Sequence, residues 1–95
     1  IERENYKRKS NEVLKKLGDL YLKNNKFDDL LDLSQKFISI DRINEIAFEL
    51  KIKALISINK KDDALKQFSI LKNLLKAELD VLPSKSIIDI INKIQ

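Results

Sequence analysis

The sequence of 95 residues contains neither cysteine nor histidine. Without cysteine it can form no disulfides and no thiolate metal sites, and we expect it to work in a reducing cytoplasm. The absence of histidine removes the commonest general base and the commonest metal ligand. We therefore expect the chain not to be an enzyme, with no catalytic residues, no metal site and no cofactor.

Glycine and proline are also nearly absent, with one residue of each. Because sandwiches and barrels need many turn residues, this scarcity excludes them. Hydrophobic residues make up 43% of the chain and charged residues 36%, a composition rich in helix formers. No apolar run approaches the roughly 18 residues of a membrane span, so we expect no membrane contact. We expect one domain over residues 1–95 and, because residue 1 is isoleucine, a fragment of a longer protein.

The net charge of +4 arises from 19 basic and 15 acidic residues that are interspersed along the chain. Such mixing is typical of a solvated helical surface. One basic run near the start consists of Arg3, Lys7, Arg8 and Lys9, and a nucleic-acid contact there is the alternative interpretation. Since basic runs on helices are usually solvated faces, we expect no direct binding of nucleic acid.

The sequence of Asn25–Leu31 returns 34 residues later as Asn59–Leu65, with five of the seven residues identical. A period of about 34 is the spacing of helix-turn-helix units that stack on copies of themselves. The asparagine that opens each copy tolerates the left-handed conformation in which many helices end. The chain is therefore expected to be a short helical repeat array.

Each copy of this turn carries two adjacent aspartates, Asp28 with Asp29 and Asp62 with Asp63. In the first turn of a helix, a carboxylate stabilises the positive end of the helix dipole by about 0.3–1 kcal/mol. An acid–base or metal-binding pair is the alternative, but both copies lack a histidine to complete such a site. We interpret the aspartates as residues that favour the start of a helix.

Apolar residues at helical spacing predict five helices. The third is apolar nearly all the way round, which predicts that it forms the centre of the fold. Gly18 lies inside the first helix, where glycine costs roughly 1 kcal/mol relative to alanine, so we expect a close helix crossing there, as at the small Ala64. In the first helix the residues at helical spacing are Val13, Leu14, Leu17, Leu20 and Tyr21. The expected bounds are about Glu4–Lys23, Phe27–Ser39, the residues after Asn44 to Ile58, Asp62–Ala77, and Ser84 or Ser86 to Ile94.

Two units numbered from Asn11 and Glu45 resemble the tetratricopeptide pattern of large, small and aromatic positions. The units depart from that pattern at a few places, for instance at Lys51 and Ile52, which replace a leucine-glycine pair. The matching residues are Leu14, Leu17, Gly18, Tyr21 and Leu30 in the first unit, and Phe48, Leu55, Ala64 and Phe68 in the second.

A second resemblance spans almost the whole chain. The run Glu78–Ser84 is similar to the acidic-Leu-Gly-X-Pro-Ser run that lies between the fourth and fifth helices of the bacterial transcriptional activator domain. Asp80 and Asn59 stand where that family has glycines, and Arg42 stands where it has a proline. The other matching segments are Leu17-Gly18, Leu20-Tyr21, Phe27–Leu31, Asp41, Asn44-Glu45, Ala54-Leu55, Asp63–Leu65, Phe68 and Glu78-Leu79.

This resemblance implies a domain that follows a DNA-binding winged-helix or output domain and serves in protein contact, dimerisation or signal reception. The fold class expected is all-α, a tetratricopeptide-like right-handed superhelical stack of about five antiparallel helices. Its parts would be repeat unit 11–44, repeat unit 45–78 and a capping helix over 84–95. The alternative function is that of a tetratricopeptide scaffold from an unrelated bacterial protein that binds a partner protein.

In tetratricopeptide stacks the first helix of each unit lines the concave face. Three apolar residues there, Leu22, Ile46 and Ile56, favour a protein partner, either an upstream domain of the same regulator or a second copy in a homodimer. The alternative is that these three residues pack against the fifth helix or the N-terminal segment. The whole candidate interaction face consists of Glu12, Lys15, Asp19, Leu22, Lys23, Ile46, Glu49, Lys53, Ile56 and Ser57.

Overall fold

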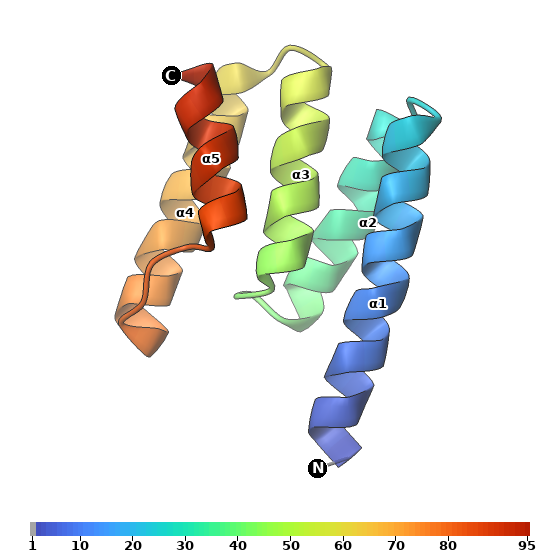
Figure 1. Ribbon diagram of the computed structural model, residues 1–95, viewed down its shortest axis with the longest axis vertical. Helices are drawn as coiled ribbons and strands as arrows, with labels where there is room; N and C mark the ends of the chain where they lie inside the picture. Colours follow the sequence, from blue (N-terminus) through green and yellow to red (C-terminus); the bar gives the residue numbers. More distant parts are fainter. Residues whose placement is uncertain (1) are drawn as a thin grey trace.

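The computed structural model describes the backbone of residues 2–95 and the side chains from Arg8 onward. Within that range it contains five helices and no strand: α1 (Glu2–Lys23), α2 (Phe27–Ile40), α3 (Glu45–Ser57), α4 (Lys61–Leu79) and α5 (Lys85–Ile94). Successive helices run antiparallel, and α1, α3 and α5 lie in front of α2 and α4 (Figure 1). This arrangement confirms the predicted all-α, tetratricopeptide-like stack. The helix ends lie within two residues of the predicted ones.

The turn inside each helix pair has the same structure in both copies. Asn25, with φ 58°, and Asn59, with φ 63°, adopt the left-handed conformation. The next residue, Lys26 or Lys60, donates its backbone N–H over 2.8 Å to the carbonyl five residues earlier. This is the Schellman arrangement that ends many helices. The recurring asparagine therefore ends two helices in the same way, as the repeat predicts.

Helix α3 is the centre of the fold, as its apolar composition predicts. It contributes side chains to two clusters of buried residues. One cluster lies between α1, α2 and α3 and includes Leu14, Leu30 and Leu50. The other lies between α3, α4 and α5 and includes Ala64 and Ile87. Because α3 is packed on both sides, the positions of α1 and α5 relative to each other depend on this one helix.

Gly18 marks the crossing of α1 and α3. A Cβ atom added to Gly18 would lie 2.5 Å from Cδ1 and 2.6 Å from Cδ2 of Leu50. Since carbon atoms in contact are normally about 3.5–4.0 Å apart, any other residue at this position would require the Leu50 side chain to move. The expected close crossing at this glycine is therefore confirmed.

The apolar residues at helical spacing along α1 are not all buried. Val13 is 55% exposed and Leu20 is 53% exposed. Leu14 is buried, whereas Leu17 and Tyr21 are half-buried. The reason is the place of α1 in the stack: it packs mainly against α2 and α3, and Val13 and Leu20 lie on its outer face.

Two side-chain caps position the starts of α3 and α5. The Asn44 side chain accepts a hydrogen bond from the backbone N–H of Ala47 (3.1 Å) and donates to the Asn11 side chain of α1 (3.0 Å). Ser84 accepts from the backbone N–H of Ile87 over 3.4 Å, which selects Ser84 over Ser86 as the cap of α5. Serine and asparagine are preferred at this position because their oxygens satisfy the free N–H groups of the first helical turn.

Candidate interaction groove

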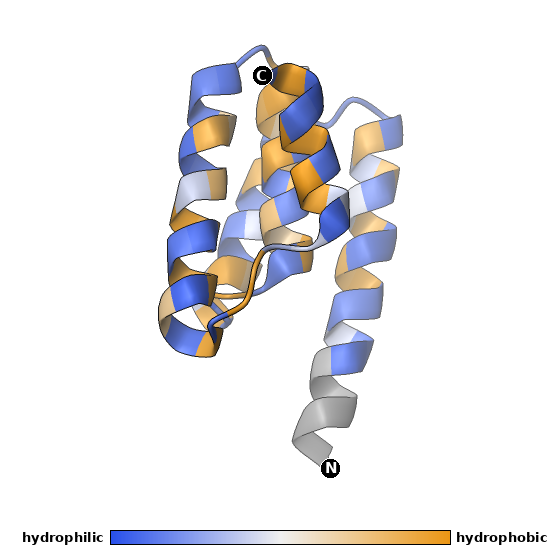
Figure 2. Cartoon of the chain, turned by 60° about the vertical axis from the view of Figure 1, so that its left-hand side comes forward, coloured by the Kyte–Doolittle hydropathy of each residue, from blue (hydrophilic) through white to orange (hydrophobic). Residues whose placement is uncertain are grey.

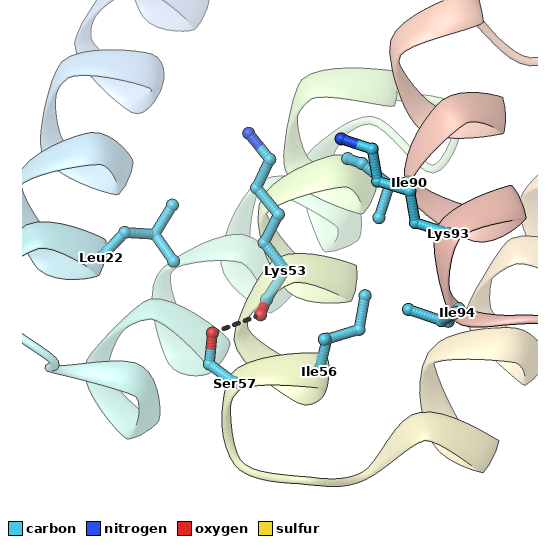
Figure 3. A pocket seen from close by; sticks show the side chains of 7 residues that line it. All are labelled: Leu22, Lys53, Ile56, Ser57, Ile90, Lys93 and Ile94. Atoms are coloured by element: carbon cyan, nitrogen blue, oxygen red, sulfur yellow. Dashed lines mark hydrogen bonds between the residues drawn. The ribbon is translucent and has the colours of Figure 1, made fainter.

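A groove of about 330 Å³ lies between α1 and α5, with α3 as its floor. In Figure 3, Leu22 of α1 lies on one side, Lys53, Ile56 and Ser57 of α3 lie in the middle, and the α5 side chains lie opposite. We call this site the groove. Its lining residues are Leu22, Lys53, Ile56, Ser57, Ile90, Lys93 and Ile94.

The repeat places aliphatic side chains at regular positions along the groove. Leu22, Ile56 and Ile90 are each 34 residues apart and come from α1, α3 and α5. The carbonyls of Leu22 and Ile56 accept hydrogen bonds from Asn25 and Asn59, so both residues precede the same turn. The equal spacing therefore builds an apolar row across three helices.

These aliphatic side chains belong partly to the core. Leu22 packs against the cluster around Leu14, and Ile56, Ile90 and Ile94 pack against the cluster around Ile87. All four are half-buried rather than buried. Their inner sides therefore stabilise the fold, and their outer sides form an apolar floor that water reaches.

The polar groups of the groove are mainly cationic. Lys53 lies 3.3 Å from the carboxylate of Glu49, one helical turn away. Lys93 on α5 is exposed, and Figure 3 shows its side chain and that of Lys53 extending toward the same end of the groove. The Ser57 hydroxyl donates to the carbonyl of Lys53 over 2.8 Å. A ligand of the groove would therefore meet an apolar surface with two ammonium groups beside it.

The structure brings together four of the ten residues predicted for the interaction face: Leu22, Lys53, Ile56 and Ser57. Glu49 lies beside the groove through its ion pair with Lys53. Ile46 packs instead against the cluster around Leu14. The remaining four residues are exposed on α1 without lining the groove: Glu12, Lys15, Asp19 and Lys23.

Sequence reasoning missed the α5 wall of the groove, which consists of Ile90, Lys93 and Ile94. A signal for Ile90 was present, because it follows Ile56 by one further period of 34. The signal was hidden because α5 does not start at the repeated position: its cap, Ser84, follows the cap of α3, Asn44, by 40 residues.

The other candidate sites do not gather into a chemical centre. The four aspartates of the repeated turn are exposed in the first turns of α2 and α4. Among the residues with described side chains, no three carboxylates are close enough to hold a metal ion. Of the basic run, Arg8 and Lys9 are exposed, and the side chains of Arg3 and Lys7 lie outside the described residues. Within the described chain, no helix has the length and apolar character needed to cross a membrane.

The fold and the groove define a helical-repeat domain whose first helices share one face. The family model of the bacterial transcriptional activator domain matches residues 1–95. The chain therefore belongs to this family, and the resemblance of its sequence is confirmed. It is a domain of a transcription regulator, and the family is regulatory rather than enzymatic. No curated protein and no solved structure matches the chain.

Proposed function

We propose that this domain is the protein-interaction module of a bacterial transcription regulator and that the groove binds the other protein surface. The observation that carries the proposal is the apolar row of Leu22, Ile56 and Ile90, which three helices hold open to solvent. Aliphatic side chains on an exposed concave surface favour contact with another protein surface. The role of the module would be dimerisation, interdomain contact or signal reception.

The charges around the groove favour a protein over a nucleic acid. A surface that grips phosphates should be uniformly basic, and its binding should weaken steeply with salt. Here Lys53 is paired with Glu49, and the floor is aliphatic. The partner would be an upstream domain of the same regulator or a second copy of this one. Because bacterial transcription takes place in the cytoplasm, we infer that the module works there.

Membership in the activator-domain family replaces the alternative of a scaffold from an unrelated protein. The division into repeat units 11–44 and 45–78 remains part of the proposal. Within it, α5 would act as the first helix of a further unit, because Ile90 continues the row of Leu22 and Ile56. The predicted capping role of segment 84–95 and this lining role are compatible, since Ile87 and Ile91 are buried while Ile90 lines the groove.

The test is photo-cross-linking in the bacterium that carries the regulator. A photo-reactive amino acid replaces Lys93 at the groove and, as the matched control, the exposed Lys72 on α4, which does not line it. We expect irradiation to join Lys93, and not Lys72, to another protein surface. Mass spectrometry of the products identifies that surface. An absence of products from Lys93, or equal amounts from both positions, would rule out the groove as the interface.

A double substitution tests the apolar floor in the same assay. Leu22→Glu with Ile56→Glu should abolish the cross-link from Lys93, because two charges would enter the apolar row. The control pair is Val13→Glu with Leu20→Glu, which alters exposed aliphatic residues of α1 outside the groove. Circular dichroism checks that the helices remain. If only the variant with Leu22→Glu and Ile56→Glu loses helicity, both residues belong to the core. The cross-linking comparison of Lys93 with Lys72 then decides whether the groove is the interface.

A further inference from the structure

A second exposed apolar surface lies at the connection between α4 and α5. Leu79 is 55% exposed, Val81 is 47% exposed and Leu82 is 72% exposed. We call residues 78–82 the acidic segment, because Glu78 and Asp80 lie among these three apolar residues. Figure 2 shows hydrophobic residues along this connection on the outside of the molecule. The segment therefore exposes apolar and anionic groups together.

The backbone holds the acidic segment in this exposed position. Asp80 ends α4 in the left-handed conformation, with φ 52°. Two residues beyond the segment, Ser84 donates its backbone N–H to the Glu45 carboxylate over 2.8 Å, and Pro83 between them is buried. The acidic segment therefore lies between the left-handed end of α4 and the bond that joins Ser84 to α3.

The acidic segment and the groove are complementary in chemistry. The segment combines three exposed apolar side chains with two carboxylates, and the groove combines an apolar floor with Lys53 and Lys93. The carboxylates now pair with cations of their own chain: Glu78 with Arg42, and Asp80 with Lys76 over 2.6 Å. The pair of Asp80 with Lys76 is exposed on both sides, and such pairs contribute only about 0–1 kcal/mol, so an exchange of this partner costs little.

One chain cannot join its own segment to its own groove. The connection between α4 and α5 lies at one end of the helices, whereas the last turns of α1, α3 and α5, which line the groove, lie at the opposite end (Figure 1). A second copy has no such restriction. In a pair related by a two-fold axis, each copy can place its segment in the groove of the other, so that both contacts form at once.

We propose that a second copy of this chain is the occupant of the groove, and that it binds through the acidic segment 78–82. The apolar side chains of the segment lie against Leu22, Ile56 and Ile90, and the Asp80 carboxylate lies near Lys93. This inference rests on the proposed function and names the partner. It explains why two complementary surfaces of one chain are both left uncovered.

The test is the self-association of the purified chain, measured by sedimentation velocity over a range of concentrations. We expect reversible dimers. Leu82→Asp in the segment and Lys93→Glu in the groove should each lower the association constant by at least about tenfold, because each places an unpaired or repelled carboxylate in the contact. Both residues are exposed, so the variants should keep the helical circular dichroism of the parent.

A control sample makes the test specific. Ile70→Asp, a change at an exposed aliphatic residue of α4 outside both surfaces, should associate like the parent. If this variant lost association as strongly as Leu82→Asp, the loss would come from any added carboxylate, and the pairing of segment with groove would be contradicted.

The outcomes separate this inference from the proposed function. A parent chain that stays monomeric at every concentration, or a Leu82→Asp variant that dimerises like the parent, overturns the inference. Loss of association in the Lys93→Glu variant alone would reject the segment while supporting the groove as an interface. If the chain is monomeric, the cross-links from Lys93 still decide the proposed function.

Discussion

Replacement of Gly18 by alanine sets two effects of similar size against each other. In the interior of a helix, alanine is more stable than glycine by about 1 kcal/mol. The added methyl group would, however, lie 2.5 Å from a methyl carbon of Leu50, which is roughly 1 Å closer than carbon atoms normally approach. Leu50 is only 2% exposed and lies in the buried cluster, so it has little room to move.

We expect the clash to prevail, because overpacking a closed core costs about 1–3 kcal/mol. The Gly18→Ala variant should therefore be less stable than the parent by about 1 kcal/mol, after the helix gain is subtracted. The measurement is urea denaturation followed by circular dichroism. A control in the same helix, Lys16→Ala against Lys16→Gly at an exposed site, measures the gain without the clash.

A double-mutant cycle isolates the contact between α1 and α3. Leu50→Ala alone should cost about 2–5 kcal/mol, because it leaves a cavity in the cluster. In that background Gly18→Ala should become stabilising, since the new methyl group enters the space that the leucine has left. The two substitutions should therefore couple favourably by about 2 kcal/mol. A Gly18→Ala variant that gains as much stability as the Lys16 comparison would show that the helices do not cross so closely.

Three further substitutions probe the repeat register, a turn and a half-buried lysine. Ala64 is fully buried between α3, α4 and α5, so Ala64→Phe should cost about 1–3 kcal/mol in chemical denaturation, and parent-like stability would place Ala64 at the surface. Asn59→Gly should raise the stability by about 0.5 kcal/mol, because φ is 63° there, whereas Asn24→Gly, at the residue before the equivalent left-handed Asn25, should not; thermal melting compares the two variants. Burial lowers the pKa of Lys51 below 10.5, so Lys51→Leu should stabilise the fold at neutral pH. Between the lowered pKa and 10.5, Lys51 keeps its proton in the unfolded chain but loses it in the folded chain. The free energy of unfolding of the parent therefore rises with pH in this range. The stability difference between Lys51→Leu and the parent should shrink accordingly. If urea denaturation gave the same stability difference between Lys51→Leu and the parent at all pH values, the burial of the charged lysine would not be its cause.

The sequence predicts well those features that one helix or one turn determines. The position of each helix follows from the period of its apolar residues, and the left-handed turns follow from Asn25 and Asn59. Features that depend on neighbours were predicted less well. Val13 and Leu20 lie at helical spacing with Leu14, but spacing cannot tell how many helices surround α1. Their exposure is decided by the stack and not by α1 itself.

The groove shows the same limit at the level of function. Its floor could be predicted in part, because Leu22 and Ile56 occupy one position of two similar units. Its second wall could not be assigned, because the connection before α5 is longer and interrupts the repeat of the helix starts. Only the packing of α5 beside α3 brings Ile90 and Lys93 opposite Leu22. A site shared by three helices therefore needs the tertiary structure to define it.

The departures of this chain from the glycines of its family have a common physical basis. Asn59 and Asp80 stand at these glycine positions, and both have the positive φ that glycine adopts most easily. Asparagine and aspartate are the other residues that enter this conformation at modest cost, because their short side chains can hydrogen-bond locally. The substitution at Asp80 thus preserves the turn that ends α4 and adds a carboxylate between the exposed Leu79 and Leu82. A glycine there would give the same backbone without the charge, so the carboxylate on which the proposed contact with Lys93 depends comes from the side chain of Asp80 and does not follow from the fold.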